Sequence, residues 1–243
     1  MQSVLLAAGM VTRLRPLTDR CPKCLLEIGG KSLLQRAVEN LIEVGADELV
    51  MVLGYRAEMI RSRMAQRFPG LRVRYIENER FDETNNAYSL LLTESAVPGG
   101  FLLLDSDILF PSELLSALLA HPARPCVALD RHGCGAEEIK IVCEPSGRMT
   151  DISKTVDPRA AAGESIGFEL FDKASRDHLF GTLRKRVLGE RRENEFYEAS
   201  FKEMIEGGRA FYAVDTSAWP AMEIDTIEDL ERARALATAA ARA

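Results

Sequence analysis

The chain has 243 residues, of which 47% are hydrophobic and 28% are charged, and its formal net charge is −6. This length is enough for one domain with a large buried core. The acidic balance supplies no broad positive field, which argues against non-specific binding to nucleic acid or to an anionic membrane.

Short apolar runs alternate with helical patterns in the first half of the chain. The first run, SVLLAA, does not alternate with polar residues, so we expect a strand buried on both faces. This β-α alternation is typical of a mostly parallel sheet covered by helices. The predicted strands are residues 3–8, 48–55, 71–78 and 99–110, and the predicted helices are 31–46, 57–68 and 85–96.

From residue 125 the pattern changes to short β segments, followed by helices and two further strands. We expect these segments to extend the sheet and to form one wall of a cleft. The predicted strands are 125–131, 138–145, 147–156, 164–171, 209–217 and 221–225, and the predicted helices are 173–188, 195–208 and 226–243.

The sequence also predicts the cellular compartment. No apolar run reaches the roughly 18 residues that cross a bilayer, and no signal-type segment opens the chain, which predicts a cytoplasmic protein. Five irregularly spaced cysteines fit a reducing compartment. Cys21 and Cys24 form a C-x-x-C without a second pair or a nearby histidine, so we interpret them as small apolar residues and not as a zinc site.

The stretch LAAGMVTRLRPLT, residues 6–18, directly follows the first predicted strand. Small residues let a backbone approach a ligand closely, and successive amide groups there can bind phosphate oxygens. Leu6, Ala7, Ala8 and Gly9 fit that role. Arg13 and Arg15 are candidate cationic partners, although a tight turn with arginines in solvent explains the stretch equally well.

Three further stretches make a specific pattern with this turn: PKCLLEIGGKSLL, LLLDSDILF and MEIDTIEDLERA. Together they resemble the signature of the nucleotidyltransferase family, which joins a nucleoside triphosphate to a sugar phosphate or a small phosphorylated alcohol. The resemblance implies a Rossmann-like, three-layer α/β/α fold of the nucleotide-diphospho-sugar transferase type, with a mixed, mostly parallel central sheet. It implies one domain, with a nucleotide-binding half over 1–124 and an acceptor-binding half over 125–243.

One residue departs from the family pattern. The family usually has a second glycine where this chain has Val11. A β-branched residue tolerates left-handed backbone angles poorly and adds bulk where phosphates should pass. We therefore expect either another path for the loop or weaker triphosphate binding.

The resemblance also implies where the cationic groups stand. Nucleotidyl transfer puts negative charge on the α-phosphate and on the departing pyrophosphate, so the site needs positioned cations. By resemblance, Lys23 would bridge the α-phosphate and the incoming oxygen. Arg13 would stabilise the pyrophosphate.

A divalent metal site is implied by two acidic pairs. Mg²⁺ prefers hard oxygen ligands and usually takes one or two carboxylates. By resemblance these are Asp107 and Asp225, with Glu223 beside them and Asp105 assigned to the nucleotide. Residues two apart in a strand share a face, so both pairs could face one cleft. A polar strand end that caps a helix would explain the first pair alone.

The segment TNNAYSLLL stands where sugar nucleotidyltransferases typically carry a G-T-A stretch. Asn85, Asn86 and Ser89 here resemble the phosphocholine, phosphonate and inositol-phosphate cytidylyltransferase branch, which implies CTP. An asparagine amide both donates and accepts, which suits the N4 amine and O2 of cytosine. Helix capping by Thr84 or Asn85 also explains these residues, and capping and base binding are compatible with each other.

Residues 138–156 resemble the same branch, in which two lysines face the acceptor. Lys140 and Lys154 are therefore candidates for binding its phosphate or phosphonate, although strand lysines often serve only solubility. A carboxylate with aromatic faces would suit an ammonium or trimethylammonium group at the other end of the acceptor. The candidates for that end are Glu195, Tyr197, Glu198 and Trp219, although Tyr197 fits core packing equally well.

The sequence thus predicts a Mg²⁺-dependent cytidylyltransferase that acts on CTP and a small phosphate or phosphonate acceptor. Phosphocholine, 2-aminoethylphosphonate and inositol phosphate all stay open, and an amino-alcohol derivative is favoured. One alternative is a sugar-1-phosphate nucleotidyltransferase that uses UTP or TTP. Another is a non-catalytic nucleotide-binding regulatory module. The sequence leaves a homodimer open.

Overall fold

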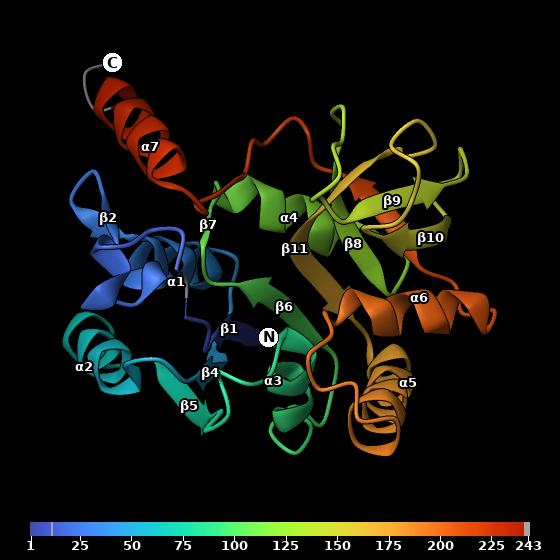
Figure 1. The fold of residues 1–243 in the computed structure, drawn as a ribbon, viewed down its shortest axis with the longest axis horizontal. Coiled ribbons are helices and arrows are strands. Elements are labelled where there is room, and N and C mark those ends of the chain that lie inside the picture. Colours follow the sequence, from blue (N-terminus) through green and yellow to red (C-terminus); the bar gives the residue numbers. More distant parts are fainter. Residues whose placement is uncertain (11, 241–243) are drawn as a thin grey trace.

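The computed structural model describes residues 1–10 and 12–240, and its central feature is one nine-stranded sheet (Figure 1). The main path of the sheet runs β10-β9-β11-β6-β1-β4-β5. Outside this path, β8 pairs with β11, and β12 pairs with β8. Val11, the departure from the family pattern, lies outside the described residues.

The first half of the chain, residues 1–124, forms the parallel part of the sheet. β1 (Gln2–Ala7) pairs in parallel with β4 (Glu48–Leu53) and with β6 (Phe101–Asp105), and β5 (Arg72–Glu77) follows β4 at the edge. Every residue of β1 after Gln2 is buried. The prediction of a strand covered on both faces is confirmed.

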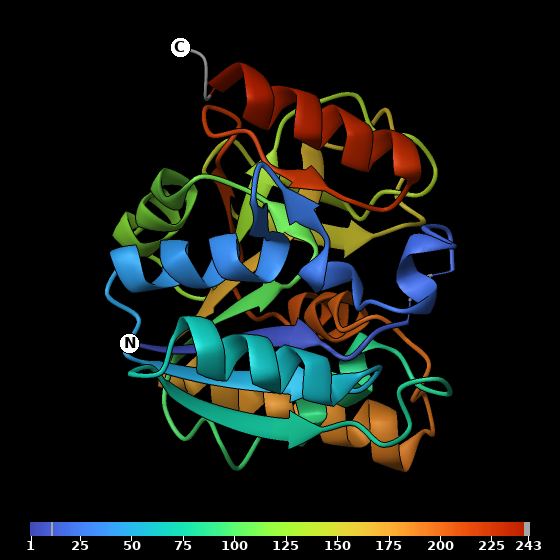
Figure 2. The same ribbon diagram turned by 90° about the vertical axis from the view of Figure 1, so that its left-hand side faces the viewer.

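Helices cover both faces of this sheet and produce three layers (Figures 1 and 2). One core cluster packs α1 (Leu33–Glu43), α2 (Ala57–Arg67) and α4 (Ser112–Ala120) on one face. The sequence analysis missed α4, although its SELLSALLA carries apolar residues at helical spacing.

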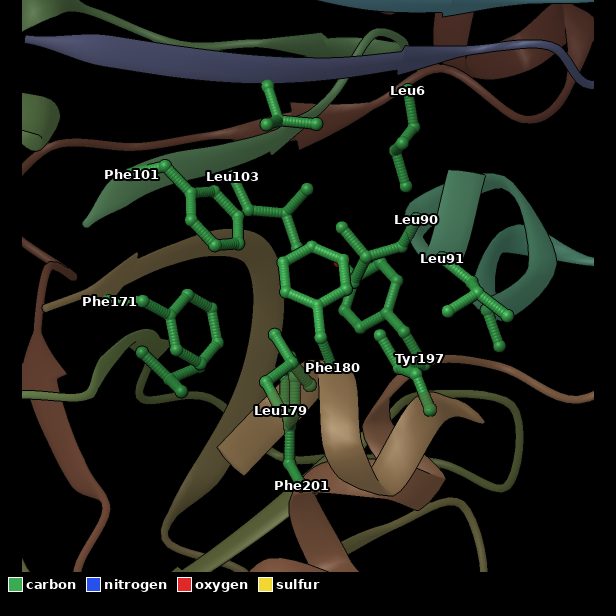
Figure 3. Packing of buried hydrophobic residues seen from close by; sticks show 14 of the residues in the cluster. Leu6, Leu90, Leu91, Phe101, Leu103, Phe171, Leu179, Phe180, Tyr197 and Phe201 are labelled. Atoms are coloured by element: carbon green, nitrogen blue, oxygen red, sulfur yellow. The ribbon is translucent and has the colours of Figure 1, made fainter. Parts of the chain in front are cut away.

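The opposite core cluster is rich in aromatic rings (Figure 3). It packs α3 (Asn86–Leu92), α5 (Lys173–Leu183) and α6 (Glu198–Glu206) against the other face. Phe101 and Phe171 stack with ring centroids 5.2 Å apart. A π-helix over Arg184–Gly189 continues α5, so the predicted helix 173–188 is present, but its last turn is a π-helix.

Residues 125–243 add antiparallel strands to the same sheet, which is therefore mixed as predicted. β11 (Gly163–Phe171) pairs antiparallel with β6, β8 and β9. Its register shifts between Ser165 and Glu169. The remaining strands of the sheet are β8 (Cys126–Asp130), β9 (Lys140–Cys143), β10 (Met149–Ser153) and β12 (Tyr212–Asp215).

Two short two-stranded sheets complete the fold and change two predicted boundaries. β2 (Glu27–Ile28) pairs with β3 (Lys31–Ser32), so α1 begins only at Leu33, where Ser32 accepts a hydrogen bond from the Gln35 amide. β7 (Ile108–Leu109) pairs with β13 (Met222–Glu223). The predicted strand 99–110 is therefore two strands with a turn between them.

The last helix, α7 (Ile227–Ala240), lies against the β2–β3 pair, as Figure 2 shows. A small third core cluster that includes Ile28, Ile224 and Leu230 joins these elements. None of the helices formed by the described residues combines the length and apolarity that crossing a membrane requires.

Candidate active site

A cavity of about 940 Å³ opens at the carboxyl ends of β1 and β6. Ligands of open α/β sheets bind at this edge of the strands. Both halves of the chain contribute to its wall. The predicted site residues that line it are Leu6, Ala7, Ala8, Gly9, Arg13, Lys23, Asn85, Asn86, Ser89, Asp105, Asp107, Lys154, Glu198, Glu223 and Asp225.

The Lys23 ammonium lies among three carboxylates on one side of the cavity. Its Nζ is 2.9 Å from Asp107 Oδ2, 2.5 Å from Asp225 Oδ1 and 3.8 Å from Glu223 Oε1. Lys23 begins a 3₁₀ turn directly after Pro22 and is only 6% exposed. Burial would lower the pKa of Lys23, but Asp107, Asp225 and Glu223 outweigh burial and raise it above its ordinary value.

Pairing of β7 with β13 brings the two acidic segments together. The Ile224 amide donates to the Asp107 carbonyl at 3.1 Å, and Glu223 stands opposite Ile108 in the ladder. One carboxylate oxygen from each of Asp107, Glu223 and Asp225 lies within 4.8 Å of the others. Three hard oxygen donors that converge in this way fit a divalent cation such as Mg²⁺.

Arg13 joins this network, whereas Arg15 does not. Arg13 Nη2 is 2.6 Å from Asp225 Oδ2. Partial burial of Asp225 opposes ionisation, but the Lys23 ammonium and the Arg13 guanidinium hold the pKa of Asp225 below its ordinary value. Arg15 pairs instead with Asp19 at 3.2 Å. Of the two arginines singled out in the sequence, only Arg13 faces the cavity.

The turn after β1 is held close to the end of β4. The Tyr55 amide donates to the Ala8 carbonyl at 3.0 Å. A Cβ at Gly54 would lie 2.7 Å from that carbonyl oxygen and 2.6 Å from Phe81 Cβ, so only glycine fits there. The sequence analysis missed this requirement for Gly54. Gly54 directly follows β4, whereas the turn that it supports directly follows β1.

The amide oxygens of the two predicted base-binding asparagines are already used. Asn85 Oδ1 caps α3 by accepting from the Asn86 amide at 2.8 Å, so the capping interpretation holds for Asn85. Asn86 Oδ1 accepts from the Tyr197 amide at 2.9 Å. These bonds leave the side-chain NH₂ groups of both residues to donate to a ligand. Each amide oxygen also keeps a second lone pair, with which it could accept one further hydrogen bond.

Asn78 supports this region and was not predicted. It is 1% exposed, and its Nδ2 donates to Thr84 Oγ1 at 3.0 Å and to Ser89 Oγ at 3.1 Å. Ser89 therefore reaches the cavity wall as part of a buried polar network. Asn78 directly follows β5 in the segment ENER, and a polar residue directly after a parallel strand was the available signal.

Lys140 does not line the cavity, although the resemblance assigned it to the acceptor. It is fully buried, and its Nζ donates to the carbonyls of Gly135 at 3.1 Å, Ala136 at 3.4 Å and Glu138 at 2.9 Å. A buried ammonium needs such acceptors, and the loop before β9 supplies them. Lys140 holds this loop in place.

Three of the four residues expected at the other end of the acceptor also lie away from the cavity wall. Tyr197 is fully buried against Phe201, and its hydroxyl donates to Asp105 Oδ2 at 3.0 Å. Glu195 pairs with Arg186 at 2.5 Å, and Trp219 packs against the apolar core on the α1 face. The aromatic enclosure expected from Tyr197 and Trp219 does not surround this cavity.

The part of the wall formed by residues 130–198 includes residues that the sequence analysis did not single out. His132 Nε2 lies 2.9 Å from Glu164 Oε2 and 4.0 Å from Asp130 Oδ2. Partial burial would lower the pKa of His132, but its hydrogen bonds to the Gly133 carbonyl and to Glu164 raise it. The unpredicted ionisable and aromatic residues of this part of the wall are Asp130, His132, Glu137, Glu138, Glu164 and Phe196.

Glu198 is the one predicted residue of the acceptor's far end that reaches the cavity. It opens α6, is 7% exposed, and its Oε2 has no hydrogen-bond partner among the described residues. Burial raises the pKa of Glu198 to about 7, with only partial opposition from the α6 backbone and from Lys154.

Replacing Glu198 by glutamine should stabilise the protein above pH 7 and leave its stability unchanged below about pH 4.5. The folded state keeps a proton that the unfolded chain releases between pKa 4.5 and about 7. The parent therefore loses up to about 3 kcal/mol as the pH rises through this window, and glutamine removes that loss. Thermal melting of both proteins at several pH values measures it. A stability difference that does not change with pH would contradict this assignment.

With this geometry established, comparison with known proteins identifies the family. Residues 3–199 match the model of the MobA-like NTP transferase domain. The chain belongs to this family. The resemblance noted in the sequence is confirmed, and so is the Rossmann-like α/β fold.

Relatives of this NTP transferase act on more than one kind of substrate, by their names. The UTP--glucose-1-phosphate uridylyltransferase AglF of Haloferax volcanii is 36% identical over 114 residues, 47% of this chain and 46% of the relative. The CMP-5'-(3-aminopropyl)phosphonate synthase of Streptomyces rubellomurinus is 30% identical over 162 residues, 67% of this chain and 25% of the relative. The chain thus spans less than half the length of either relative.

A solved structure supports the fold over the whole chain. The CTP:phosphocholine cytidylyltransferase of Streptococcus pneumoniae aligns with a TM-score of 0.80 and 22% identity, covering 97% of this chain and 98% of that one. At this identity the likeness establishes the fold alone.

Proposed function

We propose that this NTP transferase is a cytidylyltransferase that transfers CMP from CTP to a small phosphorylated alcohol or phosphonate of the phosphocholine or 2-aminoethylphosphonate type. The observation that carries the proposal is the buried Lys23 ammonium, which lies beside three convergent carboxylates at the turn after β1. The names of the phosphonate synthase and of the phosphocholine cytidylyltransferase favour CTP and a small acceptor.

The proposed reaction is one in-line displacement. A phosphate or phosphonate oxygen of the acceptor attacks the α-phosphorus of CTP, and the bond to the bridging oxygen of the β-phosphate breaks. The electron pair leaves with pyrophosphate, so no covalent enzyme intermediate is needed. Lys23 would stabilise the charge that develops at the α-phosphate, and Arg13 would do the same at pyrophosphate.

Asp107, Glu223 and Asp225 would hold a divalent cation, which would supply further charge stabilisation at the phosphate oxygens. Lys23 and Arg13 now neutralise two of these carboxylates, Asp107 and Asp225. When nucleotide binds, both cationic side chains can turn from the carboxylates to phosphate oxygens within the same cavity. The backbone from Leu6 to Gly9 would face the triphosphate.

Pyrophosphate release tests the proposal. CTP, UTP, TTP, ATP and GTP are each incubated with Mg²⁺ and one acceptor at a time, from phosphorylated amino alcohols, aminoalkylphosphonates, inositol phosphate and glucose 1-phosphate. We expect turnover with CTP and an acceptor of the first two groups. Turnover only with UTP or TTP and glucose 1-phosphate would favour the second candidate, a sugar-1-phosphate nucleotidyltransferase, which the similarity to AglF supports.

A further inference from the structure

The acceptor part of the cavity wall is strongly acidic. Between residues 130 and 198, the described side chains that line it include five carboxylates, Asp130, Glu137, Glu138, Glu164 and Glu198. The only basic side chains in that span of the wall are those of His132 and Lys154. A cavity lined mainly by one sign of charge concentrates ligand groups of the opposite sign. This part of the cavity therefore favours a ligand with a positive group.

Glu198 provides an independent indication of what that group is. A buried carboxylate normally accepts hydrogen bonds, and an oxygen without a donor costs free energy. Glu198 lines the cavity, and its Oε2 is buried without a hydrogen-bond donor among the described residues. The ionisable groups near Glu198 are Asp105, Glu169, Tyr197 and Lys154. Burial raises the pKa of Asp105 and of Glu169 well above its ordinary value, so Lys154 is the one cation in this set, and no ion pair within 4.0 Å among the described residues joins it to Glu198. A ligand that supplies an N–H donor would satisfy this oxygen.

Aromatic rings contribute little to this part of the wall. Binding of a quaternary ammonium group through its methyl surface relies on several ring faces. Phe196 is the sole Phe, Tyr or Trp among the described lining residues between 130 and 198, and the Lys154 ammonium already lies 4.7 Å from its ring centroid. The ring of Tyr197 packs against Phe201, with 5.2 Å between the centroids. The wall offers hydrogen-bond acceptors in place of an aromatic enclosure.

We infer that Glu198 binds an N–H-bearing ammonium group of the acceptor, so that the substrate class is an aminoalkyl phosphate or phosphonate with a primary to tertiary amine. The inference rests on the proposed function and narrows it. Lys154 is the cation available for the phosphate or phosphonate, and Glu198 is the anion for the amine. A trimethylammonium group has no N–H to donate to Glu198 Oε2. A polyol phosphate has no positively charged group to pair with Glu198.

A methylation series separates hydrogen bonding from size. Phosphoethanolamine and its N-methyl, N,N-dimethyl and N,N,N-trimethyl forms are compared as acceptors by kcat/KM. Because the N–H is lost only at the last step, we expect a modest decline up to the dimethyl form and a fall of roughly 10- to 100-fold at the trimethyl form. An even decline along the series would indicate bulk alone, and equal use of all four would overturn the inference.

The variant Glu198→Gln tests the residue itself. It should raise the KM of phosphoethanolamine by roughly 10- to 100-fold, leave the KM of CTP unchanged, and remove the step between the dimethyl and trimethyl forms. Glu198→Asp should restore part of the preference. Glu206→Gln is the matched control, because Glu206 lies on the same helix, is 63% exposed and does not line the cavity. An unchanged KM for phosphoethanolamine in Glu198→Gln would overturn the inference.

Failure of the proposed function gives a different result. Turnover with UTP or TTP but not with CTP would overturn the nucleotide assignment, and the same acceptor series would still test Glu198. If no nucleotide supports turnover, calorimetric binding of phosphoethanolamine and phosphocholine to the parent and to Glu198→Gln tests the inference directly. Equal binding of both compounds to the parent would then overturn it.

Discussion

Replacement of Lys23 by methionine should lower kcat by roughly 10²- to 10³-fold or more, because the reaction loses a buried cation beside the charge that develops. Methionine keeps the length and apolar volume of the side chain, so the 3₁₀ turn over Lys23–Leu25 should persist. Steady-state pyrophosphate release with saturating CTP and acceptor measures the effect. Lys31→Met is the matched control, because Lys31 is 47% exposed and pairs with Glu39 outside the cavity.

The same variant should bind a divalent cation more tightly in the absence of nucleotide. Lys23 Nζ lies within 4.0 Å of all three carboxylates, so the ammonium and the cation compete for the same oxygens. Mn²⁺ binding to the free protein, followed by electron paramagnetic resonance, measures this competition without any turnover. Unchanged turnover in Lys23→Met would rule out the proposed catalytic role of Lys23. Weaker Mn²⁺ binding would contradict the competition.

Asp225→Asn should also abolish most of the activity, by roughly 10²-fold or more in kcat at a fixed Mg²⁺ concentration. Asp225 is the carboxylate shared by Lys23 and Arg13, so its neutralisation weakens a metal ligand and releases both cationic side chains. Here Mn²⁺ binding should weaken, the opposite of the result for Lys23→Met. The opposite signs separate a metal ligand from its competing cation.

Asp177→Asn is the control for this second variant. Asp177 lies on α5, is 47% exposed, pairs with Lys173 and Arg176 of the same helix, and does not line the cavity. It should leave both turnover and Mn²⁺ binding unchanged.

Turnover that persists in excess chelator would rule out a role for Asp107, Glu223 and Asp225 as metal ligands in the reaction.

The nucleotide half was predictable because its signals are local. A non-alternating apolar run marks β1 as buried on both faces, and small residues next to it mark the turn. Convergence of Asp107 with Asp225 depends on the long-range pairing of β7 and β13. Two-residue strands carry almost no periodic signal, so resemblance to a family motif, and not the residue pattern, pointed to that convergence.

The acceptor half was less predictable because the direction of a side chain there depends on tertiary neighbours. Lys140 and Lys154 matched the motif equally well, yet Lys140 donates hydrogen bonds to three carbonyl groups of the loop over 135–138. Tyr197 and Glu198 are adjacent at the start of α6, but one packs into the core and the other reaches the cavity. Sequence spacing alone does not determine which of two neighbours faces inward.

The pairing of β6 with β11 has a practical consequence for protein engineering. Residues 1–124 and 125–243 share this ladder in the interior of a single sheet. A fragment that ends near residue 124 would leave β6 as an uncovered edge, with a row of free backbone groups and the buried residues Phe101–Leu104 beside it. Such a fragment is a candidate for aggregation. Exchange of acceptor-binding segments between relatives should therefore keep β11 and replace only the loops around it.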